Sequence, residues 1–84
     1  MSIEDELQAA AERDALVIGT EETVKAMDRL DRVVVASNAP GDIVDEVAAA
    51  AEEAGVEVGR VEADNQELGS LCMKPFAASV VGME

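Results

Sequence analysis

The fold is decided by the stretch ALVIGTEETVKAMDRLDRVVVA, residues 15–36. Its two ends, Ala15–Gly19 and Val33–Ala36, are short, uninterrupted apolar runs, the pattern of strands whose two faces are both covered. Three apolar residues recur between them at helical spacing: Val24, Met27 and Leu30. Thr20 is placed to cap this helix. The stretch therefore predicts a strand, a helix and a second strand.

The same alternation of helix and strand continues on both sides of this stretch. The elements expected there are a helix from Ile3 to near Arg13 behind a Ser2 N-cap, a helix with its apolar stripe over Ile43–Ala54, a strand over Val56–Val61, a short helix through Leu68–Cys72 and a last strand over Phe76–Val81. Pro40 suits the first position of the second of these helices, and Gly55 suits its C-cap. Asp64 and Glu67 have the spacing of a capping box. This order predicts an α/β fold, with a largely parallel or mixed sheet covered by helices on both faces.

Composition narrows the function classes. The chain has 84 residues, which we interpret as a single domain over residues 1–84, and its 49% hydrophobic content excludes an acidic disordered tail. Histidine is absent, which excludes Ser/His and Cys/His catalysis and histidine–metal sites. The only cysteine, Cys72, excludes an internal disulfide, and its place in an apolar helix row favours a buried structural thiol. We therefore expect no enzyme, no cofactor and no metal.

The charge of the chain bears on its partners. The 19 Asp and Glu outnumber the 6 Lys and Arg, and the net charge of −13 repels nucleic acids and anionic membranes in dilute buffer. The surplus is dispersed along an alanine-rich, lysine-poor chain, as in extreme halophiles, where a Debye length of about 3 Å in molar salt removes most of that repulsion. An acidic interaction module from an ordinary cell is the alternative. Without a basic leader or an apolar run of roughly 18 residues, we expect a cytoplasmic protein with no membrane partner.

Two places carry candidate binding chemistry. The segment GTEET, residues 19–23, stands at a strand-to-helix junction, where free backbone N–H groups can hold a phosphate, although an ordinary capped turn has the same pattern. Phe76 is the only aromatic residue, and it follows Lys74 and Pro75 at the expected mouth of the last strand. A lone aromatic side chain ordinarily belongs to the core. Exposed beside a cation, it would be a platform on which a base stacks.

Three segments together resemble one family. The segment NQELGSLCMKPFAASVVGM, residues 65–83, is similar to the C-terminal signature of the archaeal and eukaryotic large-subunit ribosomal protein thirty-e family, Asn-x-Glu-Leu-Gly-Thr-x-Cys-Gly-Lys-x-Phe-Arg-Val-x-Val. Residues 19–25 resemble its Gly-x-x-x-Thr-x-Lys segment, and residues 34–40 resemble its strand ending in Ala-x-Asn-x-Pro. The resemblance covers residues 15–83 and implies the kink-turn RNA-binding superfamily, which includes the seven-Ae branch. The fold it implies is a three-layer α-β-α sandwich with a four-stranded mixed sheet.

Carried over by position, the resemblance implies a surface for a sharply bent loop of ribosomal RNA. Gly19 would let the backbone approach a phosphate, Glu22 would accept from a guanine edge, and Lys25 would reach a phosphate or guanine O6. Asn38 and Pro40 would line the wall beside an extruded base. The full set implied is Gly19, Thr20, Glu21, Glu22, Lys25, Asn38, Pro40, Met73, Lys74, Pro75 and Phe76.

At this surface the sequence also departs from the family pattern. Glu21 stands where the seven-Ae branch has asparagine, Met73 replaces a glycine, and Ala77 replaces an arginine. Phe76 falls where the thirty-e branch carries a stacking phenylalanine, so the resemblance favours an exposed ring. We expect a non-catalytic RNA-binding protein of the large ribosomal subunit, with neighbouring ribosomal proteins as further partners and no DNA. The alternatives are a kink-turn protein of another particle, such as a guide-RNA modification particle or ribonuclease P, and an acidic protein-docking domain that kept the fold and lost RNA binding.

The stability of the protein should rise with salt, because a net charge of −13 on a small core repels itself and salt screens that repulsion. We expect the melting temperature, followed by circular dichroism across a potassium chloride series, to climb into the molar range. A flat or falling series would contradict the halophilic interpretation of the composition.

Overall fold

Helix and strand alternate along the chain, as its apolar periodicity predicts. The computed structural model describes residues 3–84, so the N-cap expected at Ser2 lies outside the described residues. The elements are α1 (Ile3–Glu12), β1 (Leu16–Ile18), α2 (Thr20–Lys25), the 3-10 turn η1 (Met27–Arg29), β2 (Arg32–Val35), α3 (Gly41–Ala54), β3 (Glu57–Arg60), α4 (Asn65–Leu71) and β4 (Val80–Met83).

The strands form a four-stranded mixed sheet in the order β1-β4-β2-β3. β2 and β3 are parallel, whereas β4 runs antiparallel to both of its neighbours, β1 and β2. The register places Val81 opposite Ile18 on one side and opposite Val34 on the other, so the last strand lies inside the sheet. All four residues of β4 are buried, which is the pattern of a strand covered on both faces. The mixed sheet is therefore confirmed.

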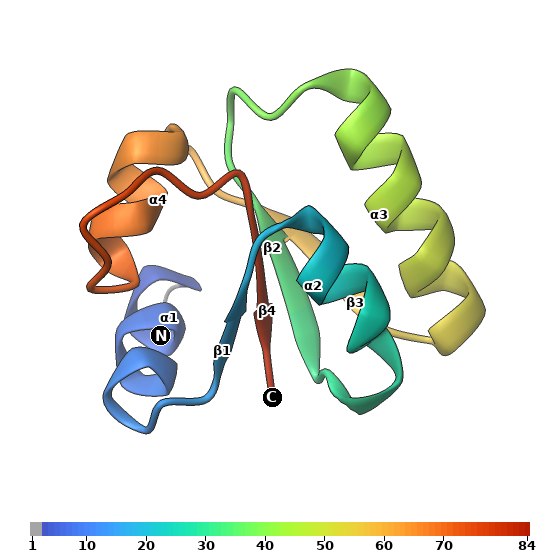
Figure 1. Ribbon diagram of the computed structural model, residues 1–84, viewed down its shortest axis with the longest axis horizontal. Helices are drawn as coiled ribbons and strands as arrows, with labels where there is room; N and C mark the ends of the chain where they lie inside the picture. Colours follow the sequence, from blue (N-terminus) through green and yellow to red (C-terminus); the bar gives the residue numbers. More distant parts are fainter. Residues whose placement is uncertain (1–2) are drawn as a thin grey trace.

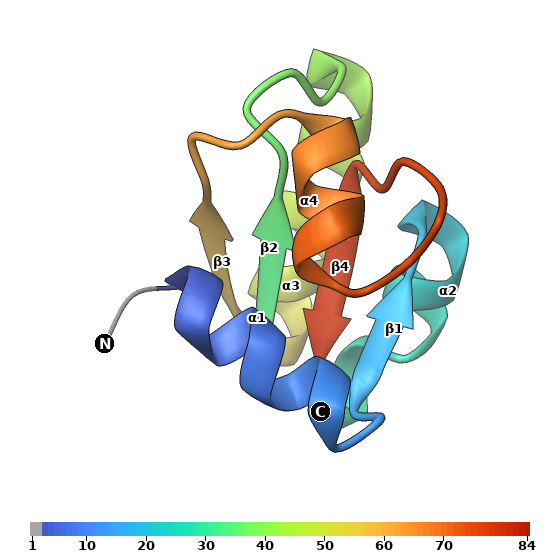
Figure 2. The ribbon, with the colours of Figure 1, turned by 90° about the vertical axis from the view of Figure 1, so that its left-hand side faces the viewer.

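Helices cover both faces of this sheet, giving the three layers seen in Figure 1. Under α1 and α4, which face the viewer in Figure 2, lies one buried cluster: Leu7, Ala10, Val34, Ala36, Val61, Leu68, Cys72, Ala78, Val81 and Met83. Under α2 and α3 lies the other: Ala26, Met27, Leu30, Val33, Val35, Val47, Ala51 and Val80. Successive residues of β2 belong to opposite clusters, as the two-residue period of a strand requires. The α-β-α sandwich implied by the family resemblance is confirmed.

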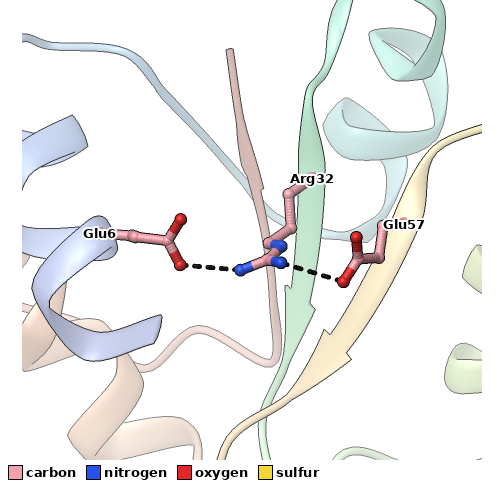
Figure 3. Close-up of polar contacts among 3 residues, drawn as sticks. All are labelled: Glu6, Arg32 and Glu57. Carbon is pink, nitrogen blue, oxygen red and sulfur yellow. Dashed lines mark hydrogen bonds and ion pairs between the residues drawn. The ribbon is translucent and has the colours of Figure 1, made fainter. Parts of the chain in front are cut away.

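Arg32, at the start of β2, ties three elements together (Figure 3). Its Nη1 lies 2.7 Å from Oε2 of Glu6 on α1, and its Nη2 lies 2.9 Å from Oε1 of Glu57 on β3. The side chains of Arg32 and Glu6 are 26% and 39% exposed, so water screens this pair less than it screens the pair with Glu57, which is 68% exposed. The planar fork of the guanidinium suits such a double contact. Arg32 therefore clamps α1 and β3 to the end of the sheet where β1 and β2 begin.

Three helices end at a residue with left-handed backbone. These residues are Asp14 after α1 (φ 56°), Gly55 after α3 (φ 71°) and Met73 after α4 (φ 61°). In each case the next N–H reaches back across the helix end: Ala15 N to Ala10 O at 2.9 Å, Val56 N to Ala51 O at 2.9 Å, and Lys74 N to Gly69 O at 3.0 Å. This is the Schellman arrangement, in which glycine is the usual left-handed residue. The C-cap expected at Gly55 is confirmed, whereas Met73 carries a side chain in the same conformation.

Two helix starts differ from those expected. Gly19, not Thr20, is the N-cap of α2, because the turn out of β1 takes a backbone conformation that suits glycine. Thr20 is therefore the first residue of the helix, and no side chain caps its first turn. Pro40 is the N-cap of α3 rather than its first residue, and its carbonyl accepts from Ile43 N at 3.1 Å and Val44 N at 3.0 Å. The capping box of Asp64 and Glu67 is confirmed at the start of α4.

Two apolar assignments were also wrong. The last strand begins at Val80 rather than Phe76, because the preceding loop is tied to α4: Ala78 N donates to the carbonyl of Asn65 at 2.9 Å. Ala54, expected on the buried stripe of α3, is exposed at the last position of the helix. The stripe itself is confirmed at Val47 and Ala51, which are buried.

Met73→Gly should stabilise the protein. A left-handed backbone costs a residue with a Cβ about 1–2 kcal/mol, and the side chain of Met73 is 61% exposed and loses little packing when removed. The extra freedom of glycine in the unfolded chain offsets part of the gain, which leaves roughly 0.5–1 kcal/mol. We expect thermal melts to shift upward by about 2–6 °C. Gly55→Met makes the reverse change at the matching position of α3 and should lower the melting temperature. Destabilisation by both substitutions would show that Met73 is not strained.

Candidate nucleic-acid interface

Three loops meet at one end of the sheet, at the top of Figures 1 and 2. Because β4 is antiparallel to β1 and β2, it begins where they end. The ladder continues one residue into each loop: Gly19 N donates to Val80 O at 2.9 Å, and Ala36 N donates to Ser79 O at 2.9 Å. The β1–α2 turn, the β2–α3 loop and the α4–β4 loop therefore converge. The residues implied by the family resemblance all lie in these loops or on α2.

Gly19 makes the sharp turn from β1 into α2. Its backbone, with φ 104° and ψ 156°, occupies a region that is essentially restricted to glycine. A Cβ placed on it would meet no atom within 4 Å, so the turn is open to an approaching group. The first N–H groups of a helix lack partners within the helix, and here no side chain caps them. The turn can therefore accept an anion at close range.

Helix α2 carries charge on its outer side. Glu21 and Glu22 in its first turn are exposed, and Lys25 is exposed at its end. Thr23 points the other way: its side chain is fully buried, and its Oγ1 donates to the carbonyl of Val17 at 3.5 Å. At about 1.5 Å per residue, Lys25 lies more than one helical turn from the start of the helix. The lysine is therefore set back from the edge where the loops meet.

Asn38 joins the β2–α3 loop to the start of α4. Its Oδ1 accepts from the backbone N–H of Asn65 at 2.9 Å, and its Nδ2 donates to Asn65 Oδ1 at 3.1 Å. The backbone donor fixes which amide atom is the oxygen. The neighbouring Ser37 N also donates to the carbonyl of Ala63 at 2.9 Å. Asn38 therefore holds two loops in place, and both the oxygen and the nitrogen of its amide are already hydrogen-bonded to Asn65.

The α4–β4 loop lies directly against α4. A Cβ on Gly69 would overlap the carbonyl oxygen of Phe76 and would come within 3.3 Å of the Cα of Ala77, so only glycine lets the loop backbone approach this closely. The approach leaves side chains on the outside: Phe76 is 54% exposed and Met73 is 61% exposed. The core alternative for Phe76 is therefore wrong. The ring is displayed at the surface, as the family resemblance implies.

The Cys72 thiol lies beneath this loop. Its residue is 1% exposed, and burial raises the pKa of the thiol while the positive charge of Lys74 opposes part of that rise. A protonated, buried thiol is neither a nucleophile nor a metal ligand at neutral pH. Cys72 is a packing residue, as its place in the apolar row of the helix predicts.

The charge carried by α2, the start of α3 and the α4–β4 loop is mixed. Lys25 and Lys74 are exposed, and neither forms an ion pair within the part of the chain that the structure describes, whereas Arg29 and Arg32 are paired with carboxylates. Cations without partners can contact phosphates. Exposed carboxylates lie at the starts of α2 and α3 and repel anions. An anion that binds to this surface must therefore lie beside one of the lysines.

Metal-binding and membrane-spanning features were not found between residues 3 and 84. No three His, Cys, Asp or Glu side chains gather there so as to hold a metal ion. No helix in that range combines the length and the hydrophobicity needed to cross a bilayer.

The structure divides the expected site residues between the two sides of the sheet. The loop carrying Met73–Phe76 lies over α4, whereas the starts of α2 and α3 lie on the opposite face, and Asn38 bridges toward α4 (Figure 1). Sequence reasoning missed two residues that position these loops, Asn65 and Gly69. Both belong to the Asn-x-Glu-Leu-Gly segment, which the sequence analysis used to identify the family resemblance, and neither was given a structural role. A helix glycine without an obvious purpose was the available signal.

Comparisons with known proteins point to one family. A sequence model of the ribosomal protein L7Ae/L30e/S12e/Gadd45 family matches residues 1–84. Large ribosomal subunit protein eL30 of Sulfolobus acidocaldarius is 30% identical over 84 residues, which are 98% of this chain and 81% of the relative. An RNA-binding protein of Geobacillus kaustophilus is 36% identical over 85 residues, which are 99% of this chain and 98% of the relative.

Solved structures share the fold. The 15.5kD RNA binding protein of Giardia lamblia superposes with a TM-score of 0.86 at 24% identity, covering 96% of this chain and 69% of that one. A Bacillus halodurans protein of unknown function superposes with a TM-score of 0.83 at 25% identity, covering 92% of this chain and 78% of the other. The first likeness concerns the fold alone.

Gly69→Ala should destabilise the protein by pushing the α4–β4 loop off α4. Inserting a methyl group into a packed contact typically costs about 1–3 kcal/mol. The control is Gly41→Ala at the start of α3, where a Cβ meets no atom within 4 Å and alanine is the better helix former. Urea unfolding of both variants measures the difference. Equal stability of the two variants would show that the contact at Gly69 relaxes without cost.

Proposed function

Because the chain belongs to the ribosomal protein L7Ae/L30e/S12e/Gadd45 family, we propose that it is an RNA-binding protein of the large ribosomal subunit that grips ribosomal RNA at a kink-turn or a similar bent loop. Two relatives support this class of function, since one is a large-subunit ribosomal protein and the other an RNA-binding protein. The family is non-catalytic, in line with a chain that has no histidine. The protein would act on the ribosome, in the cytoplasm.

The observation that carries the proposal is the exposed ring of Phe76 on the α4–β4 loop, which leads to the end of the sheet where Gly19 lies. Phe76, the single aromatic residue, is 54% exposed and Met73 in the same loop is 61% exposed, so two large apolar side chains are available to a partner there. Proteins that read single-stranded RNA stack unpaired bases on such rings. An open glycine turn on the other side of the sheet end supplies room for the RNA backbone.

In this proposal the bend of the RNA lies across the end of the sheet. A phosphate sits at the turn of Gly19 and Thr20, and the carboxylate of Glu22 accepts from a guanine edge. Pro40 and the β2–α3 loop line the wall beside an extruded base. The amide of Asn38 contributes mainly by holding that loop through Asn65, because both of its ends already engage that residue.

The acidic charge of the protein sets the conditions for this function. A net charge of −13 repels RNA at low ionic strength, so binding needs either high salt or close contacts that outweigh the repulsion. Stacking on Phe76 and backbone contacts at Gly19 depend little on charge and persist in salt that screens the rest. The proposal therefore places the protein in a high-salt cytoplasm.

A second candidate within RNA binding is favoured by one comparison. The RNA-binding protein of Geobacillus kaustophilus is 36% identical and is matched over 98% of its length, whereas the large-subunit protein of Sulfolobus acidocaldarius is 30% identical and is matched over 81%. The chain would then bind a bent RNA in another particle. A map of ribosomes purified from the source would separate the two, since only the first candidate places this chain on ribosomal RNA.

Phe76→Ala should weaken the binding of a kink-turn RNA without unfolding the protein. Stacking on an aromatic side chain is worth about 1–3 kcal/mol per base, so we expect the Kd to rise roughly ten- to a hundredfold at fixed salt. Because the ring is 54% exposed, the melting temperature should change little. Fluorescence anisotropy and thermal melts on the same preparation test both points. A variant that keeps its fold and its affinity would remove Phe76 from the site.

Lys25→Ala should also weaken binding and should reduce the salt dependence of the Kd if the lysine meets a phosphate. Arg13→Ala is the matched control, because this exposed cation follows α1 at the opposite end of the sheet. The comparison is made over a salt titration with the same RNA. Equal losses in the two variants would mean that only net charge matters.

A further inference from the structure

A groove on the outer side of α4 is left unexplained by the contacts proposed above. It measures about 330 Å³ and is lined by Gln66, Ser70, Lys74, Pro75, Phe76 and Ala77. Gln66 and Ser70 belong to α4, whereas the other residues belong to the α4–β4 loop. Neither helix residue was among those that the family resemblance implied. The groove therefore joins the exposed ring to polar side chains without an assigned role.

The groove exists because the loop lies so close to the helix. Gly69, between Gln66 and Ser70 in the sequence, has no Cβ to hold off the backbone of Phe76. The Schellman turn at Met73 then sends the loop back along α4, with Lys74 N bonded to Gly69 O at 3.0 Å. One wall of the groove is thus an aromatic residue, and the other is the polar side of a helix.

The lining has the chemistry of a nucleotide pocket. The ring of Phe76 offers a stacking surface, and Lys74, which has no ion-pair partner within residues 3–84, offers a charge for a phosphate. The side chains of Gln66 and Ser70 are exposed and form no hydrogen bond with the described residues. An amide presents a donor and an acceptor side by side, which matches the edge of a base, and adenine above all.

A second groove limits how RNA can enter. It lies between α1 and α4, it shares Gln66 and Ser70 with the first, and it is lined by the carboxylates of Glu4, Glu62 and Glu67. Phosphates are repelled from that side, whereas Lys74 attracts them on the other. Gln66 and Ser70 thus form a ridge between an acidic side and a cationic, aromatic side. A nucleotide would lie with its base on the ridge and its phosphate toward Lys74.

We propose that this groove holds the unpaired base that stacks on Phe76, a purine whose edge is read by the side chains of Gln66 and Ser70. The inference rests on the proposed RNA-binding function and extends it from stacking, which tolerates any base, to base selection. Gln66 and Ser70 are then the residues that determine specificity, and Lys74 orients the nucleotide through its phosphate.

The test measures Kd by fluorescence anisotropy with a fluorescein-labelled kink-turn RNA at fixed molar potassium chloride. Each unpaired nucleotide of the RNA is replaced in turn by adenine, guanine, uracil and an abasic residue. We expect Gln66→Ala to raise the Kd about tenfold for the preferred base and to leave the abasic RNA unchanged. Ser70→Ala should act in the same direction but less strongly. Gln8→Ala, an exposed glutamine on α1 that lines only the acidic groove, should have no effect.

The outcomes separate this inference from the function on which it rests. If Phe76→Ala weakens binding while Gln66→Ala and Ser70→Ala bind every RNA like the unmodified protein, the groove does not read a base and the inference is overturned. If the unmodified protein binds no kink-turn RNA at any salt, the proposed function fails as well. Loss of base preference in Gln66→Ala, with an unchanged melting temperature, supports the groove as the specificity site.

Discussion

The antiparallel insertion of β4 between β1 and β2 is the constraint on which the loop end of the structure depends. Two strands end and one begins at the same edge, and the ladder bonds of Gly19 to Val80 and of Ala36 to Ser79 fix the three loops to one another. A sheet of parallel strands alone would have left the α4–β4 loop at the far end, away from Gly19. The geometry of the candidate interface therefore follows from strand order, and further backbone bonds, such as that of Ser37 N to Ala63 O, join the loops once the strands have placed them.

The cations of the protein differ in whether they form ion pairs within it. At the end of the sheet where β1 and β2 begin, Arg32 forms ion pairs with Glu6 and Glu57, so its positive charge is neutralised within the protein. Lys25 at the end of α2 and Lys74 in the α4–β4 loop, by contrast, have no ion pair among residues 3–84. In a chain with 6 cations against 19 carboxylates, Lys74 matters most, because it lines the same groove as the exposed ring of Phe76, where an anionic partner is proposed.

Three positions in or beside the loops of the candidate interface disfavour a side chain. Gly19 adopts a conformation restricted to glycine, Gly69 admits the backbone of the next loop, and Met73 is held left-handed at the end of α4. Such positions cost stability and persist where the surrounding structure determines them. Here Gly19 turns the chain into α2, Met73 turns it back along α4, and Gly69 lets the α4–β4 loop lie against the helix, with Phe76 and Lys74 exposed on that loop. The burial of apolar side chains on β2 and β4 offsets that cost in stability.

The sequence by itself determined the α/β class, the order of the elements, the capping box at Asp64 and the structural role of Cys72, because these depend on local periodicity and on neighbours a few residues apart. Family resemblance added the mixed sheet and the exposed ring of Phe76, which periodicity alone had assigned to the core. Only the tertiary structure decided where the last strand begins, why residue 69 is glycine, and that Asn38 is held by Asn65. Each of these depends on a contact between segments far apart in the chain. Such a contact forms only when the sheet has brought the loops together, and no local pattern records it.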